Sequence, residues 1–229
     1  MTKARAAEFP TRAALMQAAA AYLGDALQDA LNERGAACAA LSGGATPEPA
    51  YSLLAARDLD WPRITFALVD ERFVPPDHDA SNELMLRRAL APALAKGARL
   101  LPMYAPARDV REAAERADAL YAPLAIDVAL MGMGEDGHTA SWFVGADALD
   151  AALDADTPRT VIAIRAPQAA GAADRLTLTF SALSRARRVG LLITGAAKKR
   201  LLEQTDAGAL PIAALFRHPA GAPRIFWAD

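Results

Sequence analysis

The chain has 229 residues, of which 53% are hydrophobic and 23% are charged, and its formal net charge is −2. These values are typical of a globular protein and exclude a disordered chain, and the lack of a basic excess argues against a nucleic-acid partner. The sequence contains no run of about 18 apolar residues and no apolar signal-peptide core, so we expect a cytoplasmic protein with no membrane partner.

The first third of the chain predicts helices and strands in alternation. A helix over 11–34 is expected, because a threonine can cap its start and a glycine follows its end. Thr46 is expected to cap a second helix with Pro47 in its first position, and Ser81 to cap a third. The expected strands lie at 36–41 and 64–69, and the second and third helices lie at 47–56 and 81–94.

The rest of the chain continues this alternation. Strands are expected at 100–103, 126–131, 160–164, 176–180 and 189–193, with a last edge strand at 224–227. Helices are expected at 109–121, 196–204 and 211–216, and a loop or short helix at 147–156. The alternation predicts the α/β class, a three-layer, Rossmann-like arrangement with a largely parallel sheet flanked by helices. Ligands of such sheets bind beyond the carboxyl ends of the strands.

The loop from Ser42 to Thr46 joins a predicted strand to a predicted helix. Gly43 and Gly44 free its backbone, so N–H groups of the turn and of the helix start can converge on a phosphate group. The hydroxyls of Ser42 and Thr46 add donors, although no nucleotide P-loop motif is present. An ordinary tight turn is the alternative, and phosphate binding is favoured because two glycines and two hydroxyls coincide.

Three charged residues, Asp70, Glu71 and Arg72, follow the predicted strand at 64–69. Residues directly after a buried strand lie at the rim where a substrate binds. From these residues alone, a surface salt-bridge cluster of little energetic value is the favoured interpretation. His78, further along the same loop, is expected to be a loop or packing residue and not a base.

The run DVALMGMGEDGHTAS at 127–141 places an apolar strand before a glycine-rich turn. His138 can be neutral there near pH 7 and take a proton from water, and Asp136 can orient it. A capping aspartate and a packed histidine explain the pattern equally well. Three glycines also match the dinucleotide motif G-x-G-x-x-G, but no strand ends in an acid about 20 residues later, which disfavours a nicotinamide cofactor.

Positively charged side chains lie at the start of one predicted strand and near the start of one predicted helix. Arg175 begins the predicted strand RLTLTF, and Lys198 lies near the start of a predicted helix. Both can converge on a phosphate group, although solvated charges explain them as well. Lys199 and Arg200 adjoin Lys198, and spacing alone does not choose among the three.

Cys38, the only cysteine, lies in an apolar run, which predicts a small buried side chain in a reducing compartment. One cysteine and three scattered histidines show no metal-ligand spacing, and no G-x-S-x-G motif supplies a serine nucleophile. We expect no metal and no cofactor, and we expect a single domain over 1–229.

Four blocks of the sequence resemble the glucosamine/galactosamine-6-phosphate isomerase/6-phosphogluconolactonase family, in the family's order. They are LSGGATP at 41–47, VDERFVPPDHDASNELM at 69–85, DVALMGMGEDGHTASWF at 127–143, and RLTLTF with TGAAKK at 175–180 and 194–199. The GMGEDGHTAS and DERFVP blocks are the specific ones. The resemblance implies a sugar-phosphate isomerase-type fold and, for the lactonase branch, hydrolysis of 6-phospho-D-glucono-1,5-lactone to 6-phospho-D-gluconate in the oxidative pentose phosphate pathway.

The resemblance also implies roles for single residues. His138 is the expected general base, with Asp136 beside it and Arg72 as the third catalytic group. Asp70 and Gly134 are expected in the substrate pocket. The substrate phosphate is expected to be bound by Ser42, Gly43, Gly44, Thr46, Arg175 and Lys198, where Lys198 matches the family's G-x-x-K.

Two departures from the family pattern qualify these expectations. Ala45 stands where the family usually has serine, so one hydroxyl contact is in doubt. In the deaminase branch an aromatic residue replaces Arg72, and Asn-Glu-Pro replaces Trp142, Phe143 and Val144. The glutamate of the deaminase acid–base set therefore has no counterpart here, which favours the lactonase branch.

Two alternatives to the lactonase are retained. A glucosamine-6-phosphate deaminase/isomerase would use Asp70 to shuttle a proton and would release ammonia. A non-catalytic sugar-phosphate sensor would bind ligand without turnover, although it would not need to keep His138. We expect a monomer or a weak homo-oligomer.

Overall fold

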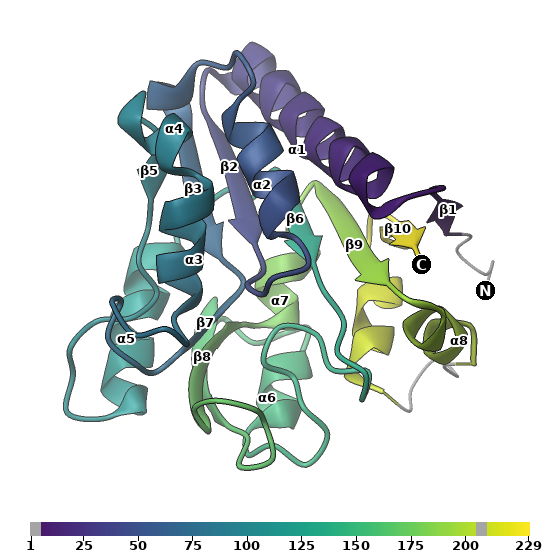
Figure 1. Ribbon diagram of the computed structural model, residues 1–229. Helices are drawn as coiled ribbons and strands as arrows, with labels where there is room; N and C mark the ends of the chain where they lie inside the picture. The colour runs from purple at the N-terminus through teal and green to yellow at the C-terminus, as the bar shows by residue number, and fades with distance from the viewer. Residues whose placement is uncertain (1–5, 205–209) are drawn as a thin grey trace.

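A seven-stranded sheet lies at the centre of the computed structural model, which describes residues 6–204 and 210–229 (Figure 1). The strand order is β1-β10-β9-β6-β2-β3-β5, and every neighbouring pair is parallel. The strands are β1 (Ala7–Glu8), β2 (Ala37–Leu41), β3 (Ile64–Leu68), β5 (Arg99–Leu100), β6 (Val128–Met131), β9 (Arg188–Thr194) and β10 (Arg224–Ala228). The predicted parallel α/β architecture is confirmed.

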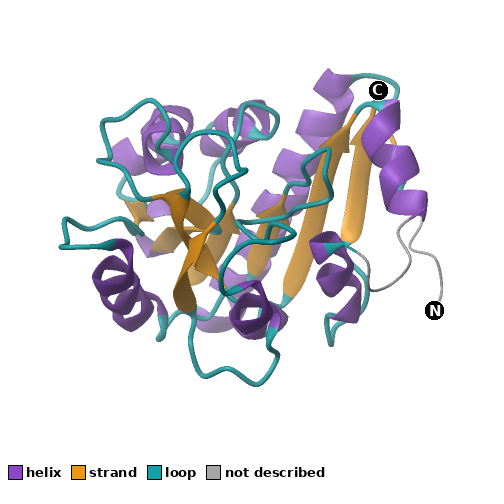
Figure 2. Ribbon diagram, turned by 90° about the horizontal axis from the view of Figure 1, so that it is seen from below, coloured by secondary structure: helices purple, strands orange, loops and turns teal. Residues whose placement is uncertain are grey.

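Helices lie on both sides of this sheet (Figure 2). They are α1 (Arg12–Arg34), α2 (Glu48–Ala55), α3 (Asn82–Ala89), α4 (Ala91–Ala95), α5 (Val110–Tyr121), α6 (Leu149–Leu153), α7 (Phe180–Ser184) and α8 (Ala196–Gln204), with 3-10 helices η1 (Trp61–Arg63) and η2 (Pro211–Arg217). The predicted first helix is confirmed: Thr11 accepts a hydrogen bond from the Ala14 N–H at 3.1 Å, and Gly35 ends it at a φ of 73°. Within the described ranges, no helix has the length and apolarity to cross a membrane.

Three strands form a second, smaller sheet that is antiparallel. Its order is β4-β8-β7, with bounds β4 (Asp70–Arg72), β7 (Val161–Arg165) and β8 (Asp174–Leu178). The prediction of a loop at 70–72 is therefore wrong, and nothing in the alternation indicated a separate antiparallel sheet. Val69 joins the two sheets, because its N–H donates to the Leu41 carbonyl at 3.0 Å and its carbonyl accepts from the Leu178 N–H at 2.9 Å.

Some predicted element bounds differ from the structure. The helix expected at 81–94 is divided into α3 and α4, because Pro92 has no N–H to continue the helical hydrogen bonds. The strand expected at 100–103 ends at Leu100. Phe180 begins α7 and does not end a strand, because the Thr179 hydroxyl caps this helix by accepting from the Ala182 N–H at 3.1 Å.

The C-terminal strand is not at the edge of the sheet, so that prediction is wrong. β10 pairs with β9 on one side and with β1 on the other. The two-residue β1 is too short to show a strand pattern in the sequence. The real edges, β1 and β5, are both two residues long, and short edge strands limit unwanted pairing with other chains.

The core fixes the strand ends that carry the site. Every residue of β2 and of β3 is buried, and one apolar cluster includes side chains from both sheets and from α1. Cys38 is buried in β2, as predicted. A closely packed platform of this kind restricts the positions of the segments that leave it.

Candidate active site

Segments that follow β2, β3, β6 and β9 surround one cavity of about 240 Å³. The convergence of the strand-end segments is confirmed. Of the eleven predicted site residues, ten line this cavity: Ser42, Gly43, Gly44, Thr46, Asp70, Arg72, Gly134, His138, Arg175 and Lys198. The eleventh, Asp136, does not line it and instead contacts the His138 ring.

His138 is held by its own loop. Asp136 Oδ1 lies 2.5 Å from the His138 Nδ1 and accepts the His138 backbone N–H at 3.1 Å. The turn is closed by the Gly134 N–H, which donates to the His138 carbonyl at 2.9 Å, and by the Gly137 N–H, which donates to the Gly134 carbonyl at 3.2 Å. With Nδ1–H donating to a carboxylate, the neutral ring keeps its lone pair on Nε2. Nε2 is then the atom that can accept a proton.

Two neighbours fix the plane of the His138 ring. A Cβ at Gly134 would lie 2.2 Å from the ring atoms Nδ1 and Cε1, so only glycine leaves room for the imidazole. On another side the ring stacks on Phe143, with centroids 4.0 Å apart and planes inclined by 28°. Stacking of this kind stabilises an aromatic pair beyond the area that it buries.

Asp136 stays ionised while it holds His138. Partial burial raises the pKa of this carboxyl, but hydrogen bonds from the backbone and ring of His138 outweigh burial and leave the pKa below its ordinary value. A carboxylate at this place stabilises the positively charged form of an imidazole.

The Ser42–Thr46 loop follows β2. The Ser42 carbonyl accepts the buried Tyr51 hydroxyl at 2.9 Å, which ties the loop to α2. Gly44 has a φ of 102°, a left-handed conformation that a residue with a Cβ rarely adopts. A Cβ at Gly43 would lie 1.9 Å from Asn82 Oδ1, so α3 packs directly against this loop.

The predicted cap of α2 is wrong. Pro47 occupies the N-cap position, and no side chain caps the helix. Pro47 already has a helical conformation, with φ −81° and ψ −13°, and its carbonyl accepts the Ala50 N–H at 2.9 Å. Thr46 lies one residue too early to cap the helix, and it lines the cavity instead. Ala45, where the family usually has serine, does not line the cavity.

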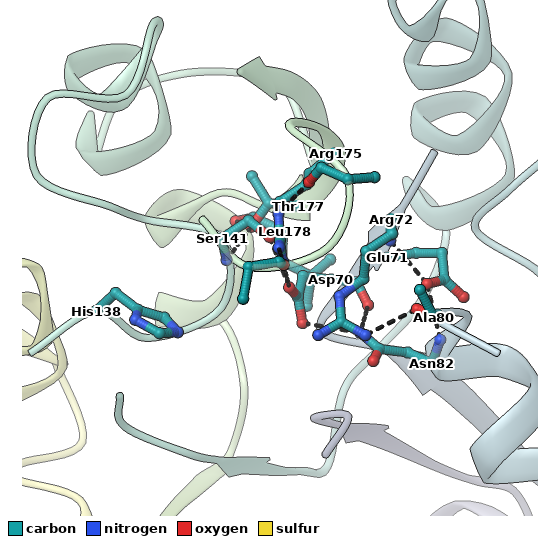
Figure 3. Close-up of polar contacts among 12 residues, drawn as sticks. Asp70, Glu71, Arg72, Ala80, Asn82, His138, Ser141, Arg175, Thr177 and Leu178 are labelled. Atoms are coloured by element: carbon teal, nitrogen blue, oxygen red, sulfur yellow. Dashed lines mark hydrogen bonds and ion pairs between the residues drawn. The ribbon is translucent and has the colours of Figure 1, made fainter. Parts of the chain in front are cut away.

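Asp70 and Glu71 are not a surface cluster, which corrects that interpretation. Their exposed fractions are 7% and 0%, because β4 pairs with β8 and also packs against α3. Asp70 accepts the Ser141 hydroxyl at 2.6 Å, and its backbone carbonyl accepts Asn82 Nδ2 at 2.8 Å. Figure 3 shows Asp70 between Ser141 and Asn82, with His138 to one side of them.

Glu71 holds the start of α3. Its carboxylate accepts four hydrogen bonds of 2.7–2.9 Å, from the backbone N–H groups of Arg72, Asn82 and Glu83 and from the Ser81 hydroxyl. Burial raises the pKa of Glu71, and these hydrogen bonds limit the rise. A negative charge is also favoured at a helix N-terminus. Through Asn82, Glu71 therefore supports both Asp70 and the Ser42–Thr46 loop.

Arg72 reaches the cavity from β4. Its Nη1 donates to the Ala80 carbonyl at 2.7 Å, and this contact restrains the guanidinium (Figure 3). Arg72 Nε is buried and has no hydrogen-bond partner among the described residues. His78 is exposed outside the cavity, and its Nδ1 accepts the Ala80 N–H at 3.0 Å.

Arg175 is buried in β8 beside the His138 loop. Its Nε and Nη2 donate to the carbonyls of Ala172 and Ala170 at 3.0 and 2.5 Å. Nη1 lies 3.9 Å from Asp70, and the guanidinium carbon lies 5.1 Å from the Phe143 ring centroid. Burial lowers the pKa of Arg175 and Asp70 opposes that effect, but a guanidinium keeps its proton near pH 7.

Lys198 and Lys199 have different surroundings. Their spacing in the sequence did not show which of them faces the cavity. Lys198 lines the cavity from the first turn of α8, and no described residue pairs with it. Lys199 instead forms an ion pair with Glu8 at 2.7 Å. Lys198 therefore lines the cavity and Lys199 does not, and the phosphate role of Lys198 stays a prediction.

Three residues that support the site were missed as such from the sequence: Asn82, Ser141 and Phe143. Asn82 and Ser141 occur in the family-like blocks, but their contacts with Asp70 appear only in the folded chain. Phe143 touches both His138 and Arg175. Phe143 ends the family-like block at 127–143, and its position five residues after the histidine was a further signal.

The cavity has the charge expected for an anionic ligand. Three cationic side chains line it, those of Arg72, Arg175 and Lys198, against one carboxylate, that of Asp70. A second cavity of about 420 Å³ lies between α5 and β7 and contains none of the predicted residues. In the part of the chain that the structure describes, no group of three His, Cys, Asp or Glu side chains could hold a metal ion.

Comparisons with known proteins agree with this geometry. The model of a family described as glucosamine-6-phosphate isomerases/6-phosphogluconolactonase matches residues 10–227. The 6-phosphogluconolactonase of Rhizobium meliloti (strain 1021) is 43% identical over 229 residues, covering 96% of this chain and 97% of the relative. That of Caulobacter vibrioides (strain ATCC 19089 / CIP 103742 / CB 15) is 40% identical over 222 residues, covering 96% of each.

Solved structures show the same similarity. The crystal structure of a 6-phosphogluconolactonase from Shewanella baltica OS155 has a TM-score of 0.93 and 31% identity, covering 100% of this chain and 99% of that chain. A monomeric glucosamine-6-phosphate deaminase has a TM-score of 0.75 at 21% identity, covering 98% and 97%. The second likeness concerns the fold alone.

Proposed function

The chain belongs to the glucosamine-6-phosphate isomerase/6-phosphogluconolactonase family, and from this premise we propose how its residues hydrolyse 6-phospho-D-glucono-1,5-lactone to 6-phospho-D-gluconate. The reaction is a step of the oxidative pentose phosphate pathway. One observation carries the proposal: a histidine whose Nε2 has no hydrogen-bond partner among the described residues lines the same cavity as a glycine loop and three cationic side chains.

The phosphate group binds in the cavity at the Ser42–Thr46 loop. Backbone N–H groups of the Ser42–Thr46 loop donate to it, the hydroxyls of Ser42 and Thr46 add donors, and Arg175 and Lys198 supply charge. This remote group does not react. Its binding energy orients the lactone carbonyl toward His138.

His138 then acts as general base. Nε2 takes a proton from a water molecule, and the water oxygen attacks the lactone carbonyl carbon. Arg72 or nearby backbone N–H groups stabilise the negative oxygen that forms. When the intermediate collapses, the bond from the carbonyl carbon to the ring oxygen breaks, and protonated His138 returns its proton to that oxygen. Water is consumed, a carboxylic acid and a hydroxyl are produced, and no cofactor or metal takes part.

The surroundings of His138 favour the lactonase over the deaminase. Phe143 stacks on the imidazole at the position where the deaminase branch has its glutamate. Among the described residues, Asp136 is the carboxylate that contacts His138, and Asp70 is held by Ser141. We further propose that the protein acts in the cytoplasm as a single domain, in a monomer or a weak homo-oligomer.

The decisive experiment measures hydrolysis of freshly generated lactone by wild type and His138→Ala, against the uncatalysed background. We expect kcat to fall about 100- to 10,000-fold in the variant, while binding of 6-phosphogluconate is retained. His78→Ala, at the exposed histidine outside the cavity, is the matched control and should change kcat by less than about twofold. Unchanged turnover in His138→Ala would contradict the mechanism.

Two further outcomes would change the assignment. Ammonia release from glucosamine 6-phosphate would support the deaminase. Binding of 6-phosphogluconate without acceleration of lactone hydrolysis by wild type would support a sensor.

A further inference from the structure

The first turn of α8, which carries Lys198, is held by residues outside the cavity. Lys198 lines the cavity, whereas the next residue, Lys199, lies against the outer strands of the sheet. Successive helical residues point about 100° apart around the axis. Any contact that fixes the direction of Lys199 therefore also fixes the direction of Lys198.

Trp227 of β10 holds the start of this helix. Its indole N–H donates to the Gly195 carbonyl at 3.0 Å, and this carbonyl also accepts the Lys199 backbone N–H at 3.4 Å. Gly195 has a φ of 87°, and its own N–H donates to the Ala228 carbonyl at 2.9 Å. Two hydrogen bonds therefore attach the turn between β9 and α8 to the end of β10.

The Lys199 side chain completes the attachment. Its Nζ lies 4.2 Å from the Trp227 ring centroid and donates to Glu8 Oε1 at 2.7 Å. Glu8 stands opposite Trp227 in the parallel β1–β10 register, so one ammonium group reaches both. Figure 1 shows β1, β10 and α8 together at one side of the molecule. We call Glu8, Gly195, Lys199 and Trp227 the α8 clamp.

The ion pair of the α8 clamp contributes little to the stability of the fold, so its main effect is on the orientation of α8. The Lys199 side chain is 24% exposed and that of Glu8 is 58% exposed. Exposed ion pairs contribute little to the free energy of unfolding. None of Glu8, Lys199 and Trp227 lines the cavity. Their shared consequence is the direction in which the first turn of α8 points.

We propose that Trp227, Lys199 and Glu8 are positioning residues that aim Lys198 at the substrate phosphate. The inference rests on the proposed function, since Lys198 is the residue through which the clamp acts. It makes the N-terminal strand β1 and the C-terminal strand β10 part of phosphate recognition, although neither contacts the ligand. The chemical class recognised is the phosphate monoester of the sugar, not its ring hydroxyls.

The test measures binding of 6-phosphogluconate and of gluconate by calorimetry in variants of the clamp. Trp227→Phe keeps a ring below Lys199 but removes the indole donor, and Lys199→Met keeps the packing stem but removes the charge. Each should weaken 6-phosphogluconate binding about 3- to 10-fold, the effect of one lost hydrogen bond. The value of kcat for the lactone should stay within about twofold of wild type, because His138 is untouched.

Two controls separate positioning from general damage. Arg200→Met removes an exposed charge from the same helix and should leave binding within about twofold of wild type. In a Lys198→Ala background, adding Trp227→Phe should have no further effect on binding, because coupled residues are not additive. Gluconate, which lacks the phosphate, should bind wild type and clamp variants equally.

Several results would overturn the inference. Unchanged 6-phosphogluconate binding in both clamp variants would do so, and so would an equal loss in the Lys198→Ala background. If Lys198→Ala itself binds as wild type, the phosphate role of Lys198 fails and the clamp proposal fails with it. Because binding is measured without turnover, a failure of the lactonase activity would be seen separately, in the hydrolysis assay.

Discussion

His138 and Lys198 line one cavity, but the chain holds them in different ways. The end at His138, our proposed base end, is local: Gly134, Asp136 and Phe143, which fix His138, all lie within five residues of it. The proposed phosphate end is assembled from distant elements. Tyr51 holds Ser42, Asn82 packs on Gly43, Asp70 approaches Arg175, and Trp227 holds the helix of Lys198.

This difference has consequences for substitution. At the base end, one short loop decides the position of a single imidazole, so changes in that loop should act on kcat. At the phosphate end, each ligand-facing group depends on another element, so changes far from the ligand should act on binding. The following predictions test this division, from the largest expected effect to the smallest.

Gly134→Ala should give the largest loss. The new Cβ would lie 2.2 Å from the His138 ring and would displace it, and a misplacement of about 1 Å can cost about 100-fold in rate. Lactone hydrolysis should show kcat falling by about that factor, with little change in 6-phosphogluconate binding. Gly132→Ala is the matched control, because its Cβ would meet Ser42 Oγ at an ordinary 3.8 Å. Equal kcat values in the two variants would refute the steric argument.

Arg175→Ala should act mainly on binding. Loss of a charged hydrogen-bond donor to the phosphate should raise KM about 10- to 100-fold and change kcat much less. Arg175→Lys keeps a charge but cannot reproduce the planar contacts to Ala170 and Ala172. Its KM should therefore lie between the KM values of wild type and of Arg175→Ala. Because Arg175 is buried, thermal unfolding should confirm that both variants fold. An unaltered KM would remove Arg175 from the phosphate end.

Phe143→Leu should have a smaller effect, and it should change both kcat and KM. Phe143 stacks on His138 and lies below the Arg175 guanidinium, so it is the one aromatic contact shared by both ends. Loss of the ring should lower kcat about 2- to 10-fold and raise KM as well. Phe143→Tyr retains the ring and should lose less of both. If Phe143→Leu changes KM alone, the stack does not position the base.

The smallest expected effect is on stability. The contributions of Asp136 and Glu71 to the free energy of unfolding should change with pH in opposite directions. The pKa of Asp136 is below its ordinary 3.8, so its contribution to stability is complete above that value and is lost as the pH falls through it. The pKa of Glu71 is above its ordinary 4.5, so its contribution is complete below 4.5 and is lost as the pH rises through the raised value.

Urea unfolding across acidic pH measures both slopes. The stability of wild type relative to Asp136→Asn should increase as the pH rises, and its stability relative to Glu71→Gln should decrease. Constant offsets from the altered hydrogen bonds do not affect these slopes. Parallel pH profiles for the two variants would contradict the opposite pKa shifts.

The loop around His138 was predictable from the sequence because its parts are contiguous, although the residue pattern alone did not favour a base over a packed histidine. An apolar strand, a glycine turn, Asp136 and His138 occur in one run, and the structure places them together. The phosphate end was identified mainly through resemblance. Residue patterns did not distinguish Lys198 from Lys199, and they wrongly favoured a surface cluster at Asp70 and Glu71. Both outcomes depend on burial and on contacts with elements far along the chain.

By itself the sequence determined the parallel α/β order, the ends of most elements and the glycine loop that carries His138, because periodicity, caps and glycine turns are local properties. Only the tertiary structure decided that β4, β7 and β8 form a separate antiparallel sheet and that β1 covers β10. It also decided which lysine faces the cavity. Most of these outcomes depend on contacts between segments far apart along the chain, such as Asp70 with Thr177 and Glu8 with Lys199, which no local pattern records.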